Sequence, residues 1–491
     1  MIRRENLLPA RLLSRLHAQY PQHSGLLETA PLLFTERERY AGLAGFREIV
    51  AVLKDNGIEI GHILERELFI QVYRFMATRH VLNAINWRRF ETDSLFQLVF
   101  PQPGMIPRPT VEAYRGAGDA ERKRIVAEYI RQHTNPHDCN QLLNRPWFMN
   151  DDGHLEFVEG SQHKYPQCHL VFDESTQNCF AFCTYCFRHA QVRGDEDMFL
   201  QKDIRQLHTY LRQHKEITDL LITGGDAGYI TAERMAQYAV PILEDPELLH
   251  IRAVRLGSRA LSYLPELILS PKYDALLDLF ARLTNGGVQV TWMAHFSTPR
   301  EILNPATIAA MRRLQSRGVM VRSQSPIMKH ISLFVDDQGK VDVDRSAQNW
   351  IDLANLLASL RCGFHSMYCA RPTGEHHYFT APLADLNRIA SKIHRSLASL
   401  HRPSRYISMT SSAGKISVLG TATVGGREAF ALKFTQGRNM GWLDRVFLAA
   451  YDEEQHTVDL LEPFDTPEFF FRQDQREIES ALAKAIEDHR E

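Results

Sequence analysis

Residues 169–186, HLVFDESTQNCFAFCTYC, begin with a short apolar run and end in three closely spaced cysteines. The run HLVF is the first of six short runs rich in residues that favour β-strands. The other five are DLLIT (219–223), AVRLG (253–257), VQVTWM (288–293), VMVRS (319–323) and FHSMYC (364–369). Amphipathic segments long enough for a helix lie between them, at 203–215, 275–283, 306–317 and 349–360. This alternation predicts an α/β fold with a parallel sheet or barrel.

The two flanks of this region have different patterns. Residues 1–150 read mainly as helices, and one helix is predicted through the apolar residues Leu68, Val72, Phe75 and Met76. After about residue 403, β-like runs follow one another closely, and a polar helix is predicted near 475–487. We therefore predict a partial (β/α)6 TIM-like barrel at 151–402, a helical N-terminal region at 1–150 and a mostly β C-terminal extension at 403–491.

Composition limits the class of protein. Of the 491 residues, 44% are apolar and 24% are charged, the ordinary balance of a globular protein. No run of 18 apolar residues occurs, so no membrane-spanning helix is expected, and the net charge of −2 gives no electrostatic case for a nucleic-acid partner. Glu5 and Pro9 interrupt the basic N-terminus, which reads as a surface helix rather than a targeting segment. Seven cysteines without a signal peptide favour reduced thiols and the cytoplasm.

The cysteines of CFAFCTYC have the spacing Cys-x3-Cys-x2-Cys. Three thiolates on one loop can hold three corners of a [4Fe–4S] cluster and leave the fourth iron open for another ligand. A structural zinc site is an alternative, because zinc takes four protein ligands and His189 could be the fourth. Free thiols are a further interpretation. The spacing favours a cluster held by Cys179, Cys183 and Cys186.

Glycine-rich or polar segments end the later β-like runs. In parallel α/β barrels the carboxyl ends of the strands form the active face, so we expect these segments to meet the cysteine loop. They are TGGDAG (223–228), LGSR (256–259), MAHF (293–296), SQSP (323–326) and CARP (369–372).

The cysteine triplet, followed by a Gly-Gly-Asp loop after the second strand, resembles the radical S-adenosylmethionine superfamily. More narrowly, a series of phrases that covers roughly half of the chain is similar to the lysine 2,3-aminomutase family. The phrases are KYP (164–166), CTYCFR (183–188), LLITGGDA (220–227), VRLGSR (254–259), AHFSTPREI (294–302), SQSPIMK (323–329), EHH (375–377) and AGKI (413–416).

The resemblance implies a cluster whose open iron binds S-adenosylmethionine (SAM), and whose reduction cleaves SAM to a 5′-deoxyadenosyl radical. Gly224, Gly225 and Asp226 would line the methionyl part of SAM, since glycines allow close backbone approach and a carboxylate accepts from an ammonium. Gln324 would lie near the same ligand. The electron would come from a flavodoxin- or ferredoxin-type donor.

The resemblance also implies a second cofactor. Lys415 matches the family lysine that forms a Schiff base with pyridoxal 5′-phosphate (PLP), a bond that requires a primary amine. Lys164, Arg259 and His295 match positions at the family's cofactor pocket. Arg188 matches an arginine that holds the substrate carboxylate.

Three positions depart from the family pattern. Lys164 is the first of two basic residues that help to bind the PLP phosphate, and Cys168 replaces the second. Ala370 and Ser408 stand where lysine-specific members have two aspartates for the substrate ammonium. An unpaired buried ammonium would cost several kcal/mol, so we predict a substrate other than lysine. Arg371 would favour a second carboxylate if it points inward. The alternative is that it forms a surface ion pair, which would leave a small or neutral amino acid as the substrate.

The sequence thus predicts an isomerase, a radical SAM, PLP-dependent 2,3-aminomutase for a small-molecule amino acid other than lysine, with an acidic one favoured if Arg371 faces the pocket. One alternative is radical modification of a lysine on a partner protein such as an elongation factor. Another is a non-catalytic scaffold with a structural metal. A homo-oligomer stays open, and the role of residues 1–150 is not determined by the sequence.

Overall fold

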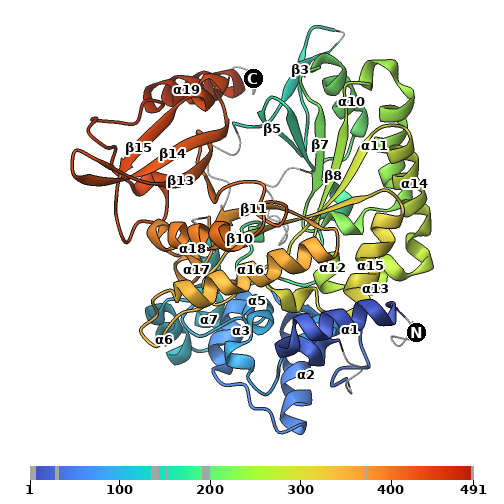
Figure 1. The fold of residues 1–491 in the computed structure, drawn as a ribbon, viewed down its shortest axis with the longest axis vertical. Coiled ribbons are helices and arrows are strands. Elements are labelled where there is room, and N and C mark those ends of the chain that lie inside the picture. Colours follow the sequence, from blue (N-terminus) through green and yellow to red (C-terminus); the bar gives the residue numbers. More distant parts are fainter. Residues whose placement is uncertain are drawn as a thin grey trace.

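The computed structural model describes residues 7–27, 32–133, 143–150, 152–190, 200–371 and 373–487. Its centre is a sheet of eleven strands in which neighbours along the sheet are also neighbours along the chain (Figure 1). The strands are β5 (Ser161–Tyr165), β6 (Cys168–Phe172), β7 (Asp219–Thr223), β8 (Ala253–Ser258), β9 (Gln289–Ala294), β10 (Met320–Ile327), β11 (Gly363–Cys369), β12 (Ser408–Thr410), β13 (Gly414–Val424), β14 (Arg427–Gly437) and β15 (Val446–Ala450).

Strands β6 to β12 run parallel, and helices connect them. Six of these strands overlap the six predicted runs, which confirms the α/β fold. The described strands form an open sheet with β5 and β15 at its edges, so they do not close into a barrel. The connecting helices are α10 (Ile204–Gln213), α11 (Ala232–Glu244), α12 (Ala260–Tyr263), α13 (Pro265–Leu269), α14 (Asp274–Asn285), α15 (Pro305–Ser316), α16 (Val343–Ser359), α17 (His376–Phe379) and α18 (Leu383–Ser396).

Each long connecting helix buries one apolar face against the sheet. In α16 the buried residues Trp350, Leu353 and Leu357 recur at helical spacing, and the Trp350 ring stacks on Phe364 of β11 with 5.9 Å between ring centres. The helix begins where the Asp342 side chain accepts a hydrogen bond from a backbone N–H of its first turn. One face of the sheet is therefore covered by helices, and the other is left for a cavity.

Strand β12 was not predicted, because three residues are too short to show in a sequence pattern. It pairs with β11 on one side and β13 on the other, so the sheet runs through the boundary predicted at 402–403. Strands β13 to β15 continue the sheet in antiparallel pairing, and α19 (Arg472–Glu487) follows them. The C-terminal extension thus completes the same sheet.

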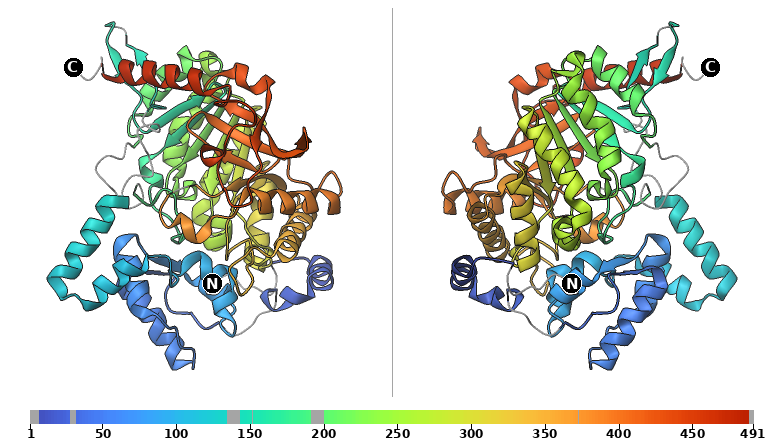
Figure 2. Two further views of the ribbon diagram at one scale, coloured as in Figure 1. Left: turned by 90° about the vertical axis from the view of Figure 1, so that its left-hand side faces the viewer. Right: turned by 90° about the vertical axis from the view of Figure 1, so that its right-hand side faces the viewer.

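The N-terminal region consists mainly of helices, which lie at one end of the sheet, whereas its last strand, β3 (Trp147–Met149), lies beside α10 at the other end (Figure 1 and Figure 2). The helix predicted through Met76 is wrong at its end, because α3 stops at Val72 and Met76 begins β2. Phe75 and Met76 are buried in extended backbone, and burial explains their apolar character. The elements are α1 (Ala10–Gln19), β1 (Arg39–Ala41), α2 (Gly42–Asp55), α3 (Ile63–Val72), β2 (Met76–Thr78), α4 (Arg79–Ala84), α5 (Ser94–Val99), α6 (Arg108–Gly116), α7 (Asp119–His133), β3 (Trp147–Met149) and, just after it, β4 (Leu155–Phe157). No helix in the described part of the chain is both long and apolar enough to cross a membrane.

The N-terminal region holds the cysteine loop by hydrogen bonds. The backbone N–H of Phe182 donates to the carbonyl of Met76 at 2.8 Å, and that of Thr184 donates to the carbonyl of Leu98 at 2.9 Å. The Thr184 hydroxyl, which is buried, donates to the carbonyl of Gln97 at 2.8 Å. These bonds give the region a structural role that the sequence did not reveal: it supports the loop between the cysteines.

We predict that Thr184→Val lowers the thermal unfolding midpoint, because it leaves the buried carbonyl of Gln97 without this donor, at a cost of about 1–3 kcal/mol. Thr421→Val on the exposed part of β13 is the matched control and should leave the midpoint within error. Differential scanning fluorimetry of both variants checks the prediction. Equal midpoints for the two variants would show that the contact contributes nothing.

Candidate active site

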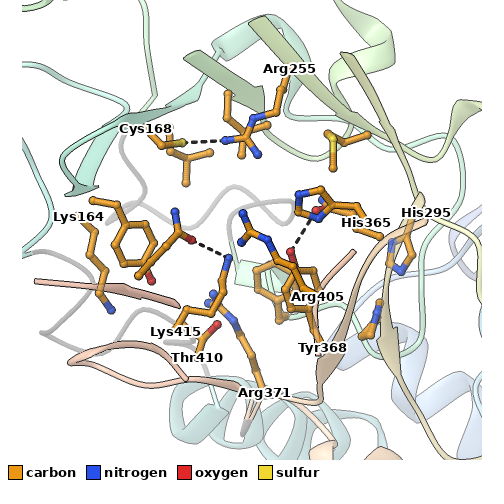
Figure 3. Close-up of a pocket in the computed structure, with 18 of the residues that line it drawn as sticks. Lys164, Cys168, Arg255, His295, His365, Tyr368, Arg371, Arg405, Thr410 and Lys415 are labelled. Atoms are coloured by element: carbon orange, nitrogen blue, oxygen red, sulfur yellow. Dashed lines mark hydrogen bonds between the residues drawn. The ribbon is translucent and has the colours of Figure 1, made fainter. Parts of the chain in front are cut away.

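A cavity of about 660 Å³ lies on the face of the parallel strands that the helices leave open (Figure 3). Because side chains alternate along a strand, every second residue of several strands lines it. In β11 a bulge in the pairing with β10 lets His365 and Tyr368, three residues apart, both line the cavity. The alternating residues include Cys168 and Leu170, Asp219 and Leu221, Ala253 and Arg255, Gln289, Thr291 and Met293, and Arg322, Gln324 and Pro326.

The cavity is strongly cationic. Seven lysine or arginine side chains line it, against the single carboxylate of Asp219. That carboxylate is paired with Arg255 at 2.7 Å, so it is already neutralised. A cavity of this charge favours ligands with carboxylate or phosphate groups. The cations are Lys164, Arg188, Arg255, Arg322, Arg371, Arg405 and Lys415.

Cys179, Cys183 and Cys186 follow β6 on one loop, whose residues Tyr185 and Phe187 line the cavity. Among the described residues, these sulfurs do not form a group within 4.8 Å of one another. Sulfurs around a single tetrahedral zinc ion would lie about 3.8 Å apart. In a cubane cluster each cysteine binds a different iron, so the sulfurs lie farther apart than around one zinc ion. The assignment of the three cysteines to a cluster stays a prediction.

The electrostatic surroundings of the loop also suit a metal cluster. Burial, together with the neighbouring thiols, raises the pKa of Cys179 well above its usual range and that of Cys186 to about 12. A buried thiol of this kind loses its proton readily only when a metal cation replaces it. The Tyr263 hydroxyl lies 2.9 Å from the sulfur of Cys183, and Arg259 donates to the same sulfur at 3.3 Å.

Arg259 lies behind the cysteine loop and is absent from the residues that line the cavity. Its guanidinium pairs with buried Glu301 at 2.7 Å and donates to the hydroxyl of Tyr263 at 2.8 Å. It also donates to the hydroxyl of Tyr185, a lining residue, at 3.2 Å. The predicted contact of Arg259 with a cofactor stays a prediction, and in this structure its side chain supports Cys183 and Tyr185.

Gly224 and Gly225 bring the loop after β7 against the segment that precedes the cysteines. A Cβ at Gly224 would lie 2.3 Å from the side-chain oxygen of Thr176, and a Cβ at Gly225 would lie 2.7 Å from the carbonyl oxygen of Asn178. Both distances are shorter than real Cβ contacts, so glycine is required by the packing of the two loops.

Asp226 is buried, and both carboxylate oxygens accept backbone hydrogen bonds, from Gly228 at 2.8 Å and from Arg259 at 2.8 Å. Burial raises its pKa to about 6 despite these bonds. Asp226 therefore joins the loop after β7 to the end of β8. Gln324 lines the cavity and accepts from the Tyr368 hydroxyl at 3.3 Å. The SAM contacts of the Gly-Gly-Asp loop and Gln324 stay predictions.

Arg188 and Arg371 both line the cavity and both approach the Phe187 ring, with guanidinium carbons 5.2 and 4.8 Å from its centre. Arg188 also donates to the side chain of Thr223 at 3.1 Å. Burial, and then the charge of Arg371, lowers the pKa of Arg188 to about 10. Two arginines close enough to influence each other in this way favour anionic ligands. Arg371 thus faces inward, as one of its two predicted alternatives required.

Lys415 is the second residue of β13, and its side chain lines the cavity. Its ammonium donates to the side-chain oxygen of Gln436 at 3.1 Å and lies 5.2 Å from the centre of the Tyr368 ring. Burial, and the nearby charges of Arg405 and Arg255, lower its pKa, while Tyr368 opposes this shift. A lysine with a depressed pKa supplies the neutral amine that a Schiff base requires.

Two further predicted residues lie on the cavity wall. Lys164 donates to the carbonyl of Ser411 at 2.8 Å and so tethers the turn just before Lys415. His295 lies 3.2 Å from the Tyr185 hydroxyl through Nε2. Burial, and then the charge of Arg259, lowers the pKa of His295 well below its usual range, so its imidazole is neutral. Their contacts with PLP stay predictions.

Sequence reasoning missed Arg255, Arg322, His365 and Arg405. The first three lie within parallel strands, where charged residues are rare. Charged residues within these strand runs could therefore have predicted a polar cavity from the sequence. Arg405 lies in the loop before β12, and no local pattern marks it.

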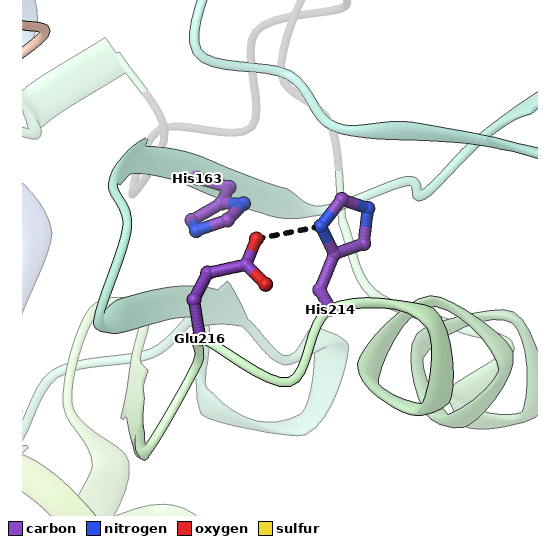
Figure 4. Close-up of side chains that lie close together, drawn as sticks. All are labelled: His163, His214 and Glu216. Atoms are coloured by element: carbon purple, nitrogen blue, oxygen red, sulfur yellow. Dashed lines mark hydrogen bonds and ion pairs between the residues drawn. The ribbon is translucent and has the colours of Figure 1, made fainter.

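One other group of potential metal ligands stands out in the described part of the chain. His163, His214 and Glu216 have ligand atoms within 4.8 Å of one another, outside the cavity (Figure 4). Both ring nitrogens of His163 are already hydrogen-bonded, to the Tyr210 hydroxyl at 2.6 Å and the Pro166 carbonyl at 3.1 Å. His214 is paired with Glu216 at 2.8 Å. The cluster is satisfied by protein contacts alone.

Sequence comparison identifies relatives, although no family model matches the chain. The chain is 29% identical to a candidate L-lysine 2,3-aminomutase of Aquifex aeolicus over 264 residues, which cover 54% of this chain and 65% of that protein. It is 29% identical to a glutamate 2,3-aminomutase of Clostridioides difficile over 170 residues, 34% of this chain and 37% of that protein. The matches thus span less than two thirds of each relative.

Among solved structures, a radical SAM methyltransferase from Sphaerobacter thermophilus aligns with a TM-score of 0.33 and 15% identity, over 74% of this chain and 93% of its own. That score is too low to carry an argument about the fold. Over about half of its length the chain is thus similar to amino-acid 2,3-aminomutases, including enzymes named for lysine and for glutamate.

Proposed function

We propose that this chain is a radical SAM, PLP-dependent amino-acid 2,3-aminomutase whose substrate is a dicarboxylic amino acid rather than lysine. The observation that carries the proposal is that one cavity adjoins both the cysteine loop and Lys415. A hydrogen abstraction at one end and a covalent nitrogen carrier at the other require this proximity.

The residues of the chain fit both cofactors. The three cysteines have the sequence spacing Cys-x3-Cys-x2-Cys on one loop, and Lys415 offers a buried amine of lowered pKa. When bound, SAM at the cluster would supply a carbon radical, and PLP would supply an electron sink that carries the amino group. The buried aromatic side chains of Tyr185 and Phe379 wall the cavity and would keep water from a reactive radical.

The charges of the cavity support an acidic substrate. Arg188 and Arg371 would each bind one carboxylate, through forked hydrogen bonds. Ala370 lines the cavity without a charge, and Ser408 is buried outside it. Among the described lining residues the one carboxylate, Asp219, is already paired with arginine. A lysine side chain would therefore place its ammonium among cations.

The same charges count against the alternative in which a lysine of a partner protein is modified, because that lysine would meet the same cationic wall. The alternative of a non-catalytic zinc scaffold is separated from the proposal by metal content, because a cluster contains iron and acid-labile sulfide and a zinc site contains neither. The first alternative predicts a protein substrate, and the second predicts zinc in place of iron and sulfide.

We predict that Cys179→Ala, Cys183→Ala and Cys186→Ala each lose most of the iron and acid-labile sulfide that the wild type takes up under anaerobic reconstitution. Loss of one of three cluster ligands is the reason. Cys362→Ala and Cys369→Ala, both free and buried, are the matched controls and should retain the cluster. Release of 5′-deoxyadenosine at the wild-type rate by any triplet variant would contradict the assignment.

We expect PLP to attach to Lys415, and to do so at a lower pH than it attaches to an ordinary lysine. The sign follows from the lowered pKa, since the neutral amine is the reacting form and is populated at lower pH. Borohydride reduction and peptide mapping locate the adduct. Lys415→Met should abolish it and Lys433→Met should not. A dominant adduct on any other lysine would refute the role of Lys415.

Substrate selection should depend on Arg371. In Arg371→Gln we expect turnover of glutamate or aspartate to fall by roughly ten- to a hundredfold, the value of one charge-assisted hydrogen bond, with little change for alanine. Arg402→Gln, on the surface, is the control. Amino-acid analysis for β-isomers after anaerobic incubation gives the readout. Efficient turnover of lysine by the wild type would overturn the specificity argument, and unchanged glutamate or aspartate turnover in Arg371→Gln would remove Arg371 from it.

A further inference from the structure

The cavity contains a second group of cations that the proposed function has not used. Arg255, Arg322 and Arg405, with His365 among them, are called here the distal cation site. Arg255, Arg322 and His365 lie near the amino-terminal ends of β8, β10 and β11, and Arg405 precedes β12, which is parallel to β11. Arg188 and Arg371 instead follow the carboxyl ends of β6 and β11. The two groups therefore belong to different ends of the strands.

The distal cation site is only partly neutralised by the protein. Arg255 pairs with Asp219 at 2.7 Å. Arg322 donates to the Ser404 hydroxyl at 2.8 Å, and among the described residues no carboxylate pairs with Arg322 or Arg405. Figure 3 shows Arg405 directed into the cavity beside Lys415 and His365. Two half-buried guanidinium groups are thus left to an external anion.

The electrostatic cost of this arrangement is visible in neighbouring groups. Burial, followed by the charges of Arg405 and Arg322, lowers the pKa of His365 to about 3. Burial and the charge of Arg405 also lower the pKa of Arg322. Like charges that depress one another in this way are relieved when a polyanion binds between them.

Cys168 connects this site to a departure in sequence. Arg255 donates to its sulfur at 3.0 Å, and burial raises the pKa of the thiol, so Cys168 stays a neutral thiol. At the place of the second basic residue expected for the PLP phosphate, the structure therefore has a neutral thiol with an arginine of β8 beside it.

We propose that Arg322 and Arg405, assisted by Arg255, bind the phosphate of PLP in place of the basic residue that Cys168 replaces. The inference rests on the proposed function, because it assumes that PLP binds Lys415. In PLP the phosphate arm is attached to the ring carbon next to the one that bears the aldehyde, so the phosphate must lie close to Lys415. Arg405 and Arg255 meet this requirement, since both line the same cavity and lie near enough for their charges to lower the pKa of Lys415. Guanidinium groups match phosphate oxygens through forked hydrogen bonds.

The test compares PLP with pyridoxal, which has the same aldehyde but no phosphate. Affinities are measured by visible absorbance on the cluster-loaded wild type and on Arg405→Gln and Arg322→Gln. In each variant the ratio of PLP affinity to pyridoxal affinity should fall roughly ten- to a hundredfold, the value of one charge-assisted hydrogen bond, because only PLP has a phosphate. Arg405→Lys should restore part of the affinity, because it keeps the charge. Arg402→Gln is the surface control, and thermal unfolding confirms that all variants fold.

An unchanged ratio of PLP to pyridoxal affinity in both variants overturns the inference. So does an outcome in which the ratio is unchanged but glutamate affinity falls, because the anion would then be the substrate carboxylate. If the wild type forms no adduct with PLP at Lys415, the proposed function itself fails. In that case, stabilisation of the wild type by inorganic phosphate that is lost in Arg405→Gln would still support a phosphate site, and its absence would refute it.

Discussion

In parallel strands joined by helices, the carboxyl ends of all strands lie on one side and the amino ends on the opposite side. The structure depends on this constraint. The cysteine loop, the Gly-Gly-Asp loop, Arg188 and Arg371 follow the carboxyl ends, and Arg255, Arg322 and His365 lie near the amino ends. Alternation along each strand then turns the polar residues of both edges toward one cavity. Two groups of cations in a single cavity are the consequence.

The remaining regions stabilise this cavity. The N-terminal helices accept hydrogen bonds from the backbone between the cysteines, and two of their tyrosines, Tyr73 and Tyr129, donate to buried Glu375 at 2.8 and 2.6 Å. The C-terminal strands extend the sheet and supply Lys415. The parallel strands thus supply much of the cavity wall, while the N-terminal region supports the cysteine loop and the C-terminal strands supply Lys415. Cofactor chemistry in this chain would therefore require all three regions.

Much of this could be predicted from the sequence, because six apolar strand runs and three spaced cysteines are strong local signals. Strand β12 could not, since three residues leave no pattern, and the end of α3 was misplaced because buried extended residues are as apolar as helical ones. The inward orientation of Arg371 and the distance of Arg259 from the cavity depend on tertiary packing. Arg405 becomes significant only when β12 brings it beside Lys415.

The central claim is that a radical formed at the cysteine loop reacts with an amino acid held near Lys415. The most direct measurement uses glutamate and aspartate deuterated at the β-carbon, SAM and a low-potential reductant, with mass spectrometry of the 5′-deoxyadenosine produced. The account predicts that deuterium from one of the two appears in 5′-deoxyadenosine and that the matching β-amino acid forms. SAM cleavage that yields 5′-deoxyadenosine without deuterium from either would contradict the account.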